Sequence, residues 1–407
     1  MKDPGGFIVD FSVGGMIHAL IIRSPIARGT LKEIVFPKFP GSYHLITASD
    51  IPGQNKLADF SAPVLADKKL SYIGQPVAIL AGPEESGLEN LASEITLSTE
   101  EEAPIFFDNA TYEDIIASRE INNGSHDRRE GGKIVSGIYI TGIQEHWYAE
   151  PHGALAVPGN KHTPAKGKKT AETITIYTAT QWPYHVRRSV AVVLGWGSES
   201  ITISPTFMTP HMDGKIWYPS LVSCHAALAA WITKRPVKLM LTREEDFMYS
   251  PKRNSTRIKI HTELGENGEI ANSQIEASLD FGAFGILEDE IMDQTCLGAL
   301  GVYRHKAFRL SGIGLRTNIS PQGPMAGFGL SQGFFAAERH ISRIADSLGQ
   351  DPAEWRKKNF LVKNDNLAVG TVLKNPVPLV ELIDTAAAMS DYYRKWVSYE
   401  LLRNRRR

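Results

Sequence analysis

Cysteines and long apolar runs are scarce in this sequence. Only Cys224 and Cys296 occur among 407 residues, and neither lies in a CxxC pattern. This scarcity excludes a disulfide framework and a cysteine-ligated zinc or iron–sulfur site within the chain, and free thiols favour a reducing compartment. No run of about 18 apolar residues predicts a membrane span, and the start, Met1–Gly6, lacks the apolar segment of a signal peptide. We therefore expect a cytoplasmic protein that does not enter a membrane.

A dominant charge is also missing, because 44 basic residues nearly balance 45 acidic ones. Such a balance offers no field that would attract nucleic acid or anionic lipid, so we expect neither as a partner. The sequence has no nucleotide-binding GxGxxG, P-loop, HExxH or nucleophile-elbow motif. The spacing of His146, His152 and His211 matches no metal site, and we interpret them as ordinary hydrogen-bonded histidines.

The length and the hydrophobic content of 42% indicate two or three domains with sizeable cores. Residues 1–120 show short strand-like runs bounded by Pro and Gly, together with one segment of helical periodicity. These are Met16–Ile22, Tyr43–Thr47 and Gln75–Ala81 for the strands and 84–95 for the helix. The polar, glycine-containing stretch 121–133 is the best candidate for a linker.

Residues 134–407 mix strands and helices, so the expected fold class is α+β. Arg257–Leu264 and Glu269–Leu279 flank a four-residue turn that contains two glycines, which predicts a β-hairpin. Other expected elements are a strand at Thr173–Tyr177, a helix at Leu221–Lys234, a strand at Val237–Leu241 and a helix that stops at Gly349. A further helix is expected to begin at once, with Asp351 as N-cap and Glu354 as its capping-box partner.

Several segments follow one another in the order of a known family. Gly142–Pro151 reads G-I-Q-E-H-W-Y-A-E-P, and Ala226–Lys238 reads A-A-L-A-A-W-I-T-K-R-P-V-K. Shorter segments accompany them at Leu20–Pro25, Tyr72–Ala78, Thr180–Pro183, Gly327–Gln332 and Ala353–Asn359. Together they resemble the xanthine dehydrogenase/aldehyde oxidase family over nearly the whole chain. The resemblance implies an α/β-hammerhead domain at 1–120 and, after the linker, the first molybdopterin-binding domain at 134–407.

The resemblance also implies a molybdenum–molybdopterin cofactor and assigns roles to residues at matching positions. In the family, the glutamine at the position of Gln144 hydrogen-bonds an oxo group on molybdenum, which suits an amide because it donates without adding charge. The other cofactor-binding positions fall on Met212, Asp213, Gly214, Ala326 and Gly327. The substrate-binding positions fall on Ile216, Gln294 and Phe328.

Two of these motifs depart from the family pattern. The usual G-G-G-F-G-G-K loop is Thr209–Lys215 here, so four glycine positions carry side chains that tolerate positive φ poorly, and Met212 replaces the aromatic residue. The arginine of the A-F-R-G-F-G motif is Ala326, whose methyl group cannot replace charge-assisted donors. Ile216 and Gln294 stand where purine-oxidising members carry charged residues, which argues against a purine substrate. Phe328 keeps an aromatic ring that can stack on a flat substrate.

In the family, the glutamate that acts as general base lies in a second molybdopterin-binding domain, which we do not find in this sequence. We therefore expect no catalytic residue here, a partner chain that carries this Glu, and FAD and 2Fe-2S clusters on further partner chains. Two interpretations stay open. The chain is a subunit of a molybdenum hydroxylase that oxidises a heteroaromatic or aldehyde with water as oxygen source, or it is a non-catalytic homologue with a degenerate cofactor site that serves as scaffold or assembly partner.

Overall fold

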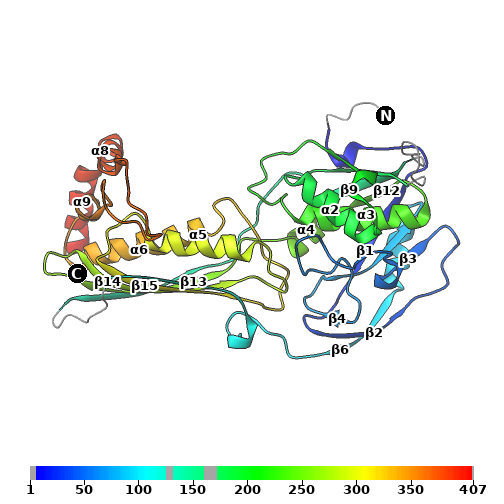
Figure 1. Ribbon diagram of the computed structural model, residues 1–407, viewed down its shortest axis with the longest axis horizontal. Helices are drawn as coiled ribbons and strands as arrows, with labels where there is room; N and C mark the ends of the chain where they lie inside the picture. The colour runs from blue at the N-terminus through cyan, green and yellow to red at the C-terminus, as the bar shows by residue number, and fades with distance from the viewer. Residues whose placement is uncertain (1–5, 125–131, 160–171, 406–407) are drawn as a thin grey trace.

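The computed structural model describes residues 6–124, 132–159 and 172–405. Their strands form three sheets, of seven, five and three strands. Figure 1 shows the two larger sheets at opposite ends of an elongated molecule, with helices packed against each.

The largest sheet has the strand order β11-β10-β9-β12-β1-β5-β3. Its strands are β1 Ile17–Arg23, β3 His44–Ile46, β5 Pro76–Gly82, β9 Gly153–Pro158, β10 Ile174–Thr178, β11 Ile201–Pro205 and β12 Val237–Met240. The central strands β1 and β12 run parallel, with Ile17 opposite Val237. The first 120 residues are therefore not separated from the rest in this sheet, because parallel pairing joins strands that lie far apart in the sequence.

Helices α2 (Pro183–Leu194) and α3 (Tyr218–Thr233) cover the seven-stranded sheet. α3 carries almost no polar face, and Ala226–Ala230 are fully buried. A helix that is apolar on all sides packs inside a core, and its alanines let it approach β9 closely. The N-terminal end of α3, with Trp217 before it, directly follows the segment that carries Met212–Ile216.

The second sheet has the order β7-β15-β14-β13-β8. Its strands are β7 Ile115–Asn123, β8 Ile134–Thr141, β13 Thr256–Leu264, β14 Ile270–Asp280 and β15 Ala307–Leu315. β13 and β14 form the expected hairpin, which is confirmed by antiparallel pairing along both strands. Helices α5 (Glu288–Leu300) and α6 (Leu330–Ser347) lie on one face of this sheet (Figure 1).

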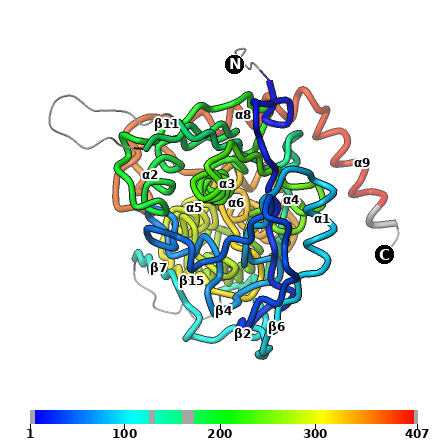
Figure 2. The backbone as a smooth tube through the Cα atoms, turned by 90° about the vertical axis from the view of Figure 1, so that its right-hand side faces the viewer, coloured from blue at the N-terminus to red at the C-terminus, as the bar shows by residue number. Residues whose placement is uncertain are grey.

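The three-stranded sheet has the order β4-β2-β6. Its strands are β2 Gly29–Val35, β4 Lys69–Leu70 and β6 Thr96–Glu101. The other helices are α1 Glu85–Ser93, α4 Arg243–Tyr249, α7 Pro352–Asn359, α8 Leu379–Ser390 and α9 Tyr392–Arg405, with 3-10 helices η1 Ile8–Asp10, η2 Ala48–Asp50, η3 Tyr112–Asp114 and η4 Ser198–Ser200. α9 projects from the side of the molecule (Figure 2). No helix in the described part of the chain has the length and apolarity needed to cross a membrane.

The expected cap of α7 is confirmed in part. Oδ1 of Asp351 accepts a hydrogen bond from the N–H of Ala353 at 2.7 Å, as an N-cap does. Glu354 does not take the expected role of bonding back to the cap. Its carboxylate instead accepts from the hydroxyl of Tyr393 at 2.7 Å, because the start of α9 lies beside α7.

The stretch expected as a linker, 121–133, overlaps a strand. Its first residues, Ile121–Asn123, belong to β7 and pair with β15, and the polar side chains of Asn122 and Asn123 are exposed there, so a polar composition does not exclude a strand. Residues 125–131 lie outside the described part of the chain. The division of the chain into domains at this stretch stays a prediction.

Candidate functional site

Loops from the two larger sheets meet at the predicted cofactor positions. The N–H of Ala326 donates to the carbonyl of Met212 at 3.0 Å, which joins the two motifs that depart from the family pattern. The N–H of Arg253 donates to the carbonyl of Gln144 at 3.0 Å, and its Nη2 donates to the carbonyl of Ala326 at 3.1 Å. Hydrogen bonds to the main-chain groups of Gln144, Met212 and Ala326 therefore bring these residues together, and Arg253 makes two of these bonds.

The predicted cofactor residues form an open surface. Gln144, Gly327 and the side chain of Met212 are exposed, the last with 48% of its surface accessible. Asp213 and Ala326 are half-buried, and Gly214 is buried. Gly327 has φ +93°, which an L side chain rarely adopts. The exposed main chain at Gly327 and the side chains of Gln144 and Met212 are thus available to a bound group.

The loop Thr209–Lys215 needs less glycine than its family pattern suggests. Among the described residues with positive φ, the loop contributes Met212 at +47° and Asp213 at +68°. Only Asp213 stands at a position that is glycine in the family, and aspartate tolerates the left-handed region better than most residues. The positive φ values in this loop are therefore confined to its centre.

Gln181, in the segment before α2, forms three hydrogen bonds that hold the centre of this loop in place; we call this set of bonds the Gln181 clamp. Its N–H donates to the carbonyl of Lys215 at 2.8 Å, and its Oε1 accepts from the N–H of Lys215 at 3.1 Å. Its Nε2 donates to Oδ1 of Asp213 at 2.9 Å. Gln181 thus fixes both the main chain after Gly214 and the carboxylate that replaces a family glycine.

The residues around Gly214 leave no room for a side chain at this position. A Cβ added there would lie 2.6 Å from Cε1 of Tyr148 and 2.7 Å from Cγ of His146, both in the buried wall below the loop. Nε2 of His152 hydrogen-bonds the carbonyl of Gly214 at 3.1 Å, and Nε2 of His146 hydrogen-bonds the carbonyl of Pro324 at 3.0 Å. Both histidines are buried and hydrogen-bonded to carbonyl groups, as the sequence interpretation expects.

A buried charged network lies beneath the loop. Oδ1 of Asp246 accepts from the hydroxyl of Tyr148 at 2.8 Å and lies 2.9 Å from Nδ1 of His152. Burial alone would raise the pKa of Asp246, but His152 and Lys215 lower it overall, so the carboxylate stays charged. Burial lowers the pKa of Lys215 to about 8, while its Nζ donates to the carbonyl of Glu150 at 2.8 Å. This network contacts the buried side of the loop and does not cover its solvent-exposed side, where Met212 lies.

Arg253 is a site residue that sequence reasoning does not find. Its Nη1 donates to Oε1 of Gln332 at 3.1 Å, so its guanidinium lies behind the main chain of Ala326. Nε of Arg253 and Nε2 of Gln332 are buried donors without a partner in the described structure. In the sequence, Lys252-Arg253 is a pair of cations between a helix and a strand, and nothing in its spacing indicates burial. Gln181 lies in the Thr180–Pro183 segment, but the resemblance assigns it no role.

The predicted substrate residues are not joined into one cluster. Ile216 packs against the core under the seven-stranded sheet. Phe328 packs against the core of the five-stranded sheet, and Gln294 lies half-buried on α5 above that sheet. The predicted substrate residues Ile216 and Gln294 therefore lie with the cores of different sheets.

Comparisons with known families cover most of the chain. Residues 110–360 match the molybdopterin cofactor-binding domain, and residues 5–104 match the a/b hammerhead domain of aldehyde oxidase and xanthine dehydrogenase. The large molybdopterin subunit of nicotinate dehydrogenase from Eubacterium barkeri is 25% identical over 397 residues, which cover 93% of this chain and 91% of that protein. A probable xanthine dehydrogenase subunit of Bacillus subtilis (strain 168) is 28% identical over 378 residues, which cover 88% of this chain and 49% of that protein.

Solved structures share the fold. Quinoline 2-oxidoreductase from Pseudomonas putida 86 superposes with a TM-score of 0.86 at 20% identity, over 98% of this chain and 53% of that one. The CO dehydrogenase of Oligotropha carboxidovorans gives a TM-score of 0.81 at 18% identity, over 98% of this chain and 54% of that one. The chain thus spans about half the length of these structures and of the Bacillus protein, but nearly the whole length of the Eubacterium subunit.

Proposed function

This chain belongs to the aldehyde oxidase and xanthine dehydrogenase family, and we propose that it supplies the first half of the molybdopterin-binding unit of a multi-subunit molybdenum hydroxylase. The observation that carries the proposal is the meeting of Gln144, Met212 and Ala326 around Arg253. The proposed reaction is oxidation of a heteroaromatic or aldehyde substrate with water as oxygen source. A purine is disfavoured, because Ile216 and Gln294 offer no charge to it.

The residues present fit an anionic cofactor. Nε of Arg253 and Nε2 of Gln332 are buried donors without a partner among the described residues, and buried donors normally have one. The exposed Gln144, the loop Met212–Gly214 and the main chain of Ala326–Gly327 would hold the group from the open side. A bound molybdenum–molybdopterin group would supply the two-electron redox chemistry. The chain itself would orient this group and neutralise part of its charge through Arg253.

Other chains would complete the enzyme. We propose that one partner carries the second molybdopterin-binding domain with the general-base Glu, and that further partners carry FAD and 2Fe-2S clusters. Support comes from the Eubacterium relative, which is named as one subunit of nicotinate dehydrogenase and is matched over 91% of its length. Cys224 and Cys296 are both buried and free, which fits a cytoplasmic setting and leaves no cluster ligands.

The alternative, a non-catalytic homologue used as a scaffold, rests on Ala326 and Asp213. It is less well supported, because Gln181 fixes the carboxylate of Asp213 and Arg253 places a guanidinium behind Ala326. The test is turnover of an aldehyde and of an N-heteroaromatic by the complex purified with its native partners. The proposal expects activity in the complex and none in the separated chain. An intact complex that oxidises neither class would favour the scaffold.

A further inference from the structure

Strand β8 (Ile134–Thr141) forms an edge of the five-stranded sheet and carries no charge or proline of its own. β8 pairs with β13 along its whole length, from Ile134 opposite Glu263 to Thr141 opposite Thr256. No strand of the described residues pairs with its other side. Exposed edges are normally blunted by charged residues, proline, bulges or a covering helix, and of these β8 has only α6 packed on one side of it, so its main chain remains able to pair with a further strand.

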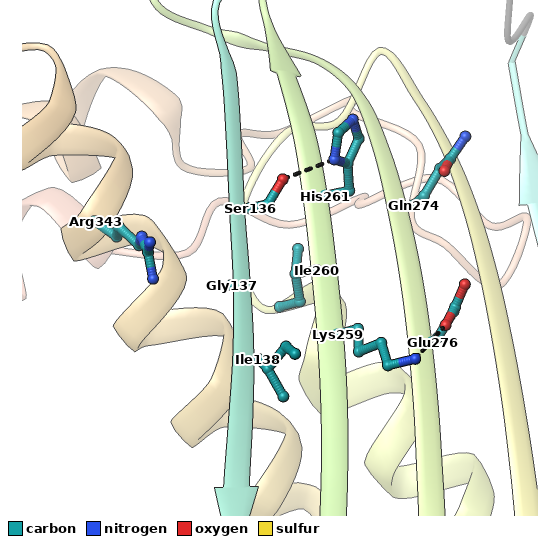
Figure 3. Close-up of a pocket in the computed structure, with 9 residues that line it drawn as sticks. All are labelled: Ser136, Gly137, Ile138, Lys259, Ile260, His261, Gln274, Glu276 and Arg343. Atoms are coloured by element: carbon teal, nitrogen blue, oxygen red, sulfur yellow. Dashed lines mark hydrogen bonds and ion pairs between the residues drawn. The ribbon is translucent and has the colours of Figure 1, made fainter.

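The open face of this edge is a row of isoleucines. Ile134, Ile138 and Ile140 are 45%, 61% and 61% exposed, on the side of the sheet away from α5 and α6. A groove beside this row is lined by polar side chains of β8, β13 and β14 and by Arg343 of α6, with Ser136 bonded to His261 at 2.7 Å and Lys259 lying 3.5 Å from Glu276 (Figure 3). An apolar strip with a polar border is the composition of a protein interface.

The helix-covered side of the same edge is cationic. Arg339 and Arg343 lie one turn apart on α6, and both are exposed. The hydroxyl of Tyr139 on β8 hydrogen-bonds Nδ1 of His340, the residue after Arg339 on α6, at 2.8 Å, and Figure 3 shows Arg343 on the helix beside β8. A strand added to β8 would therefore meet isoleucines on the open face and the arginines of α6 on the helix side, where Arg343 also reaches the end of the groove.

We propose that β8 is a strand-addition site for a different polypeptide, one whose extended segment alternates apolar and acidic residues. Main-chain hydrogen bonds would provide affinity, and the two faces would select the side chains. A second copy of this chain is the poorer occupant. Antiparallel pairing of two β8 strands puts both α6 helices on the same side of the joined sheet, so Arg339 and Arg343 of one copy would approach those of the other. This inference does not depend on the proposed cofactor chemistry.

The probe is a short capped peptide in which valine and glutamate alternate, methylated on alternate amides so that only one of its edges can pair. Its binding to the full chain is followed by fluorescence anisotropy, and hydrogen exchange locates it. We expect protection of β8 amides and saturable binding. Ile138→Lys with Ile140→Lys should weaken binding about tenfold or more, which corresponds to about 1.4 kcal/mol. Arg339→Glu with Arg343→Glu should weaken it similarly and favour a valine–lysine peptide instead.

Two controls match these variants. Met389→Lys changes an exposed apolar residue on α8, and Arg309→Glu reverses an exposed charge on β15, three strands from β8. Both should bind the peptide like the unaltered chain, and circular dichroism should show all variants folded. Absence of peptide binding to the unaltered chain, or binding by both edge variants that is as tight as binding by the unaltered chain, would overturn the proposal. Dimers in sedimentation that Ile138→Lys disperses would assign the edge to a second copy and overturn the choice of a different polypeptide.

Discussion

Nε2 of Gln181 donates to the carboxylate of Asp213 at 2.9 Å, at the one loop position where a glycine of the family has become a left-handed residue with a side chain. The same glutamine accepts from the N–H of Lys215. A carboxylate in a cofactor loop would repel an anionic group if it were free to turn. Gln181 instead holds it to the side and keeps the main chain of the loop in place.

Loss of this clamp should loosen the loop. Gln181→Ala removes a hydrogen bond to a charged group, which is worth about 1.5–3 kcal/mol, so cofactor affinity should fall roughly tenfold to a hundredfold. Molybdenum occupancy of the purified complex measures the effect. Asp213→Gly in the same chain should restore most of the occupancy, because the carboxylate then needs no partner. Full occupancy in the single variant would show that the clamp does not matter for binding.

Gln144→Ala should lower turnover of the loaded complex and leave the fold intact. The main-chain carbonyl of Gln144, which accepts from Arg253, is unchanged by the substitution. Loss of one well-placed donor at a reacting centre costs on the order of 10²–10³ in rate. Gln274→Ala, at an exposed glutamine on β14, is the control and should keep full activity. Equal turnover of the two variants would remove Gln144 from the site.

Gly214→Ala should destabilise the chain. The added methyl group would meet Tyr148 and His146 at 2.6–2.7 Å in a buried wall, and overpacking of this kind costs about 1–3 kcal/mol. Gly142→Ala is the matched control, because a Cβ there meets nothing within 4 Å. Urea unfolding compares the two. If both variants unfold at the same urea concentration as the parent, the loop does not pack against Tyr148 as described.

Buried histidines should make the fold sensitive to acid. Burial lowers the pKa of His225, His305 and His340 to about 4 each. Unfolding exposes them and returns their pKa to about 6.5, so the unfolded chain binds more protons between these values. Their stabilising contribution is therefore complete above about pH 6.5 and is lost as the pH falls toward 4. Urea unfolding from pH 7.5 to 4.5 should show this decline.

A single substitution tests one of these groups. His340→Gln can keep the hydrogen bonds that Nδ1 and Nε2 make to Tyr139 at 2.8 Å and Thr262 at 2.9 Å, without an ionisable ring. The free energy of unfolding of this variant should fall less steeply with pH, by up to about 1.4 kcal/mol per unit. An unchanged slope would mean that His340 is not neutral in the folded chain.

The sequence predicts local structure better than long-range structure. The hairpin of β13 and β14 and the cap at Asp351 follow from neighbouring residues, and both are present. The pairing of Ile17 with Val237 joins positions far apart in the chain, and no periodicity within either strand contains that information. The strand within the expected linker escapes prediction for a similar reason, since polar residues at the end of β7 face outward from a sheet.

The candidate site shows the same limit. The resemblance locates Gln144, Met212 and Ala326, and the structure brings them together. Arg253 escapes notice because a cation next to a lysine is usually solvated, and only the fold shows that it is buried behind Ala326. The effect of the replaced glycines on the conformation of the loop Thr209–Lys215 also cannot be predicted from the sequence pattern. A sequence does not reveal which loop positions have positive φ.

Whether this chain holds the molybdenum–molybdopterin group with the contacts around Arg253 can be tested directly. The decisive measurement is the molybdenum and pterin content, per chain, of the complex purified with its natural partners. We expect about one molybdenum and a matching amount of pterin per chain, both reduced in Arg253→Met. An intact complex that contains neither metal nor pterin, prepared from cells that load other molybdenum enzymes, would contradict this role.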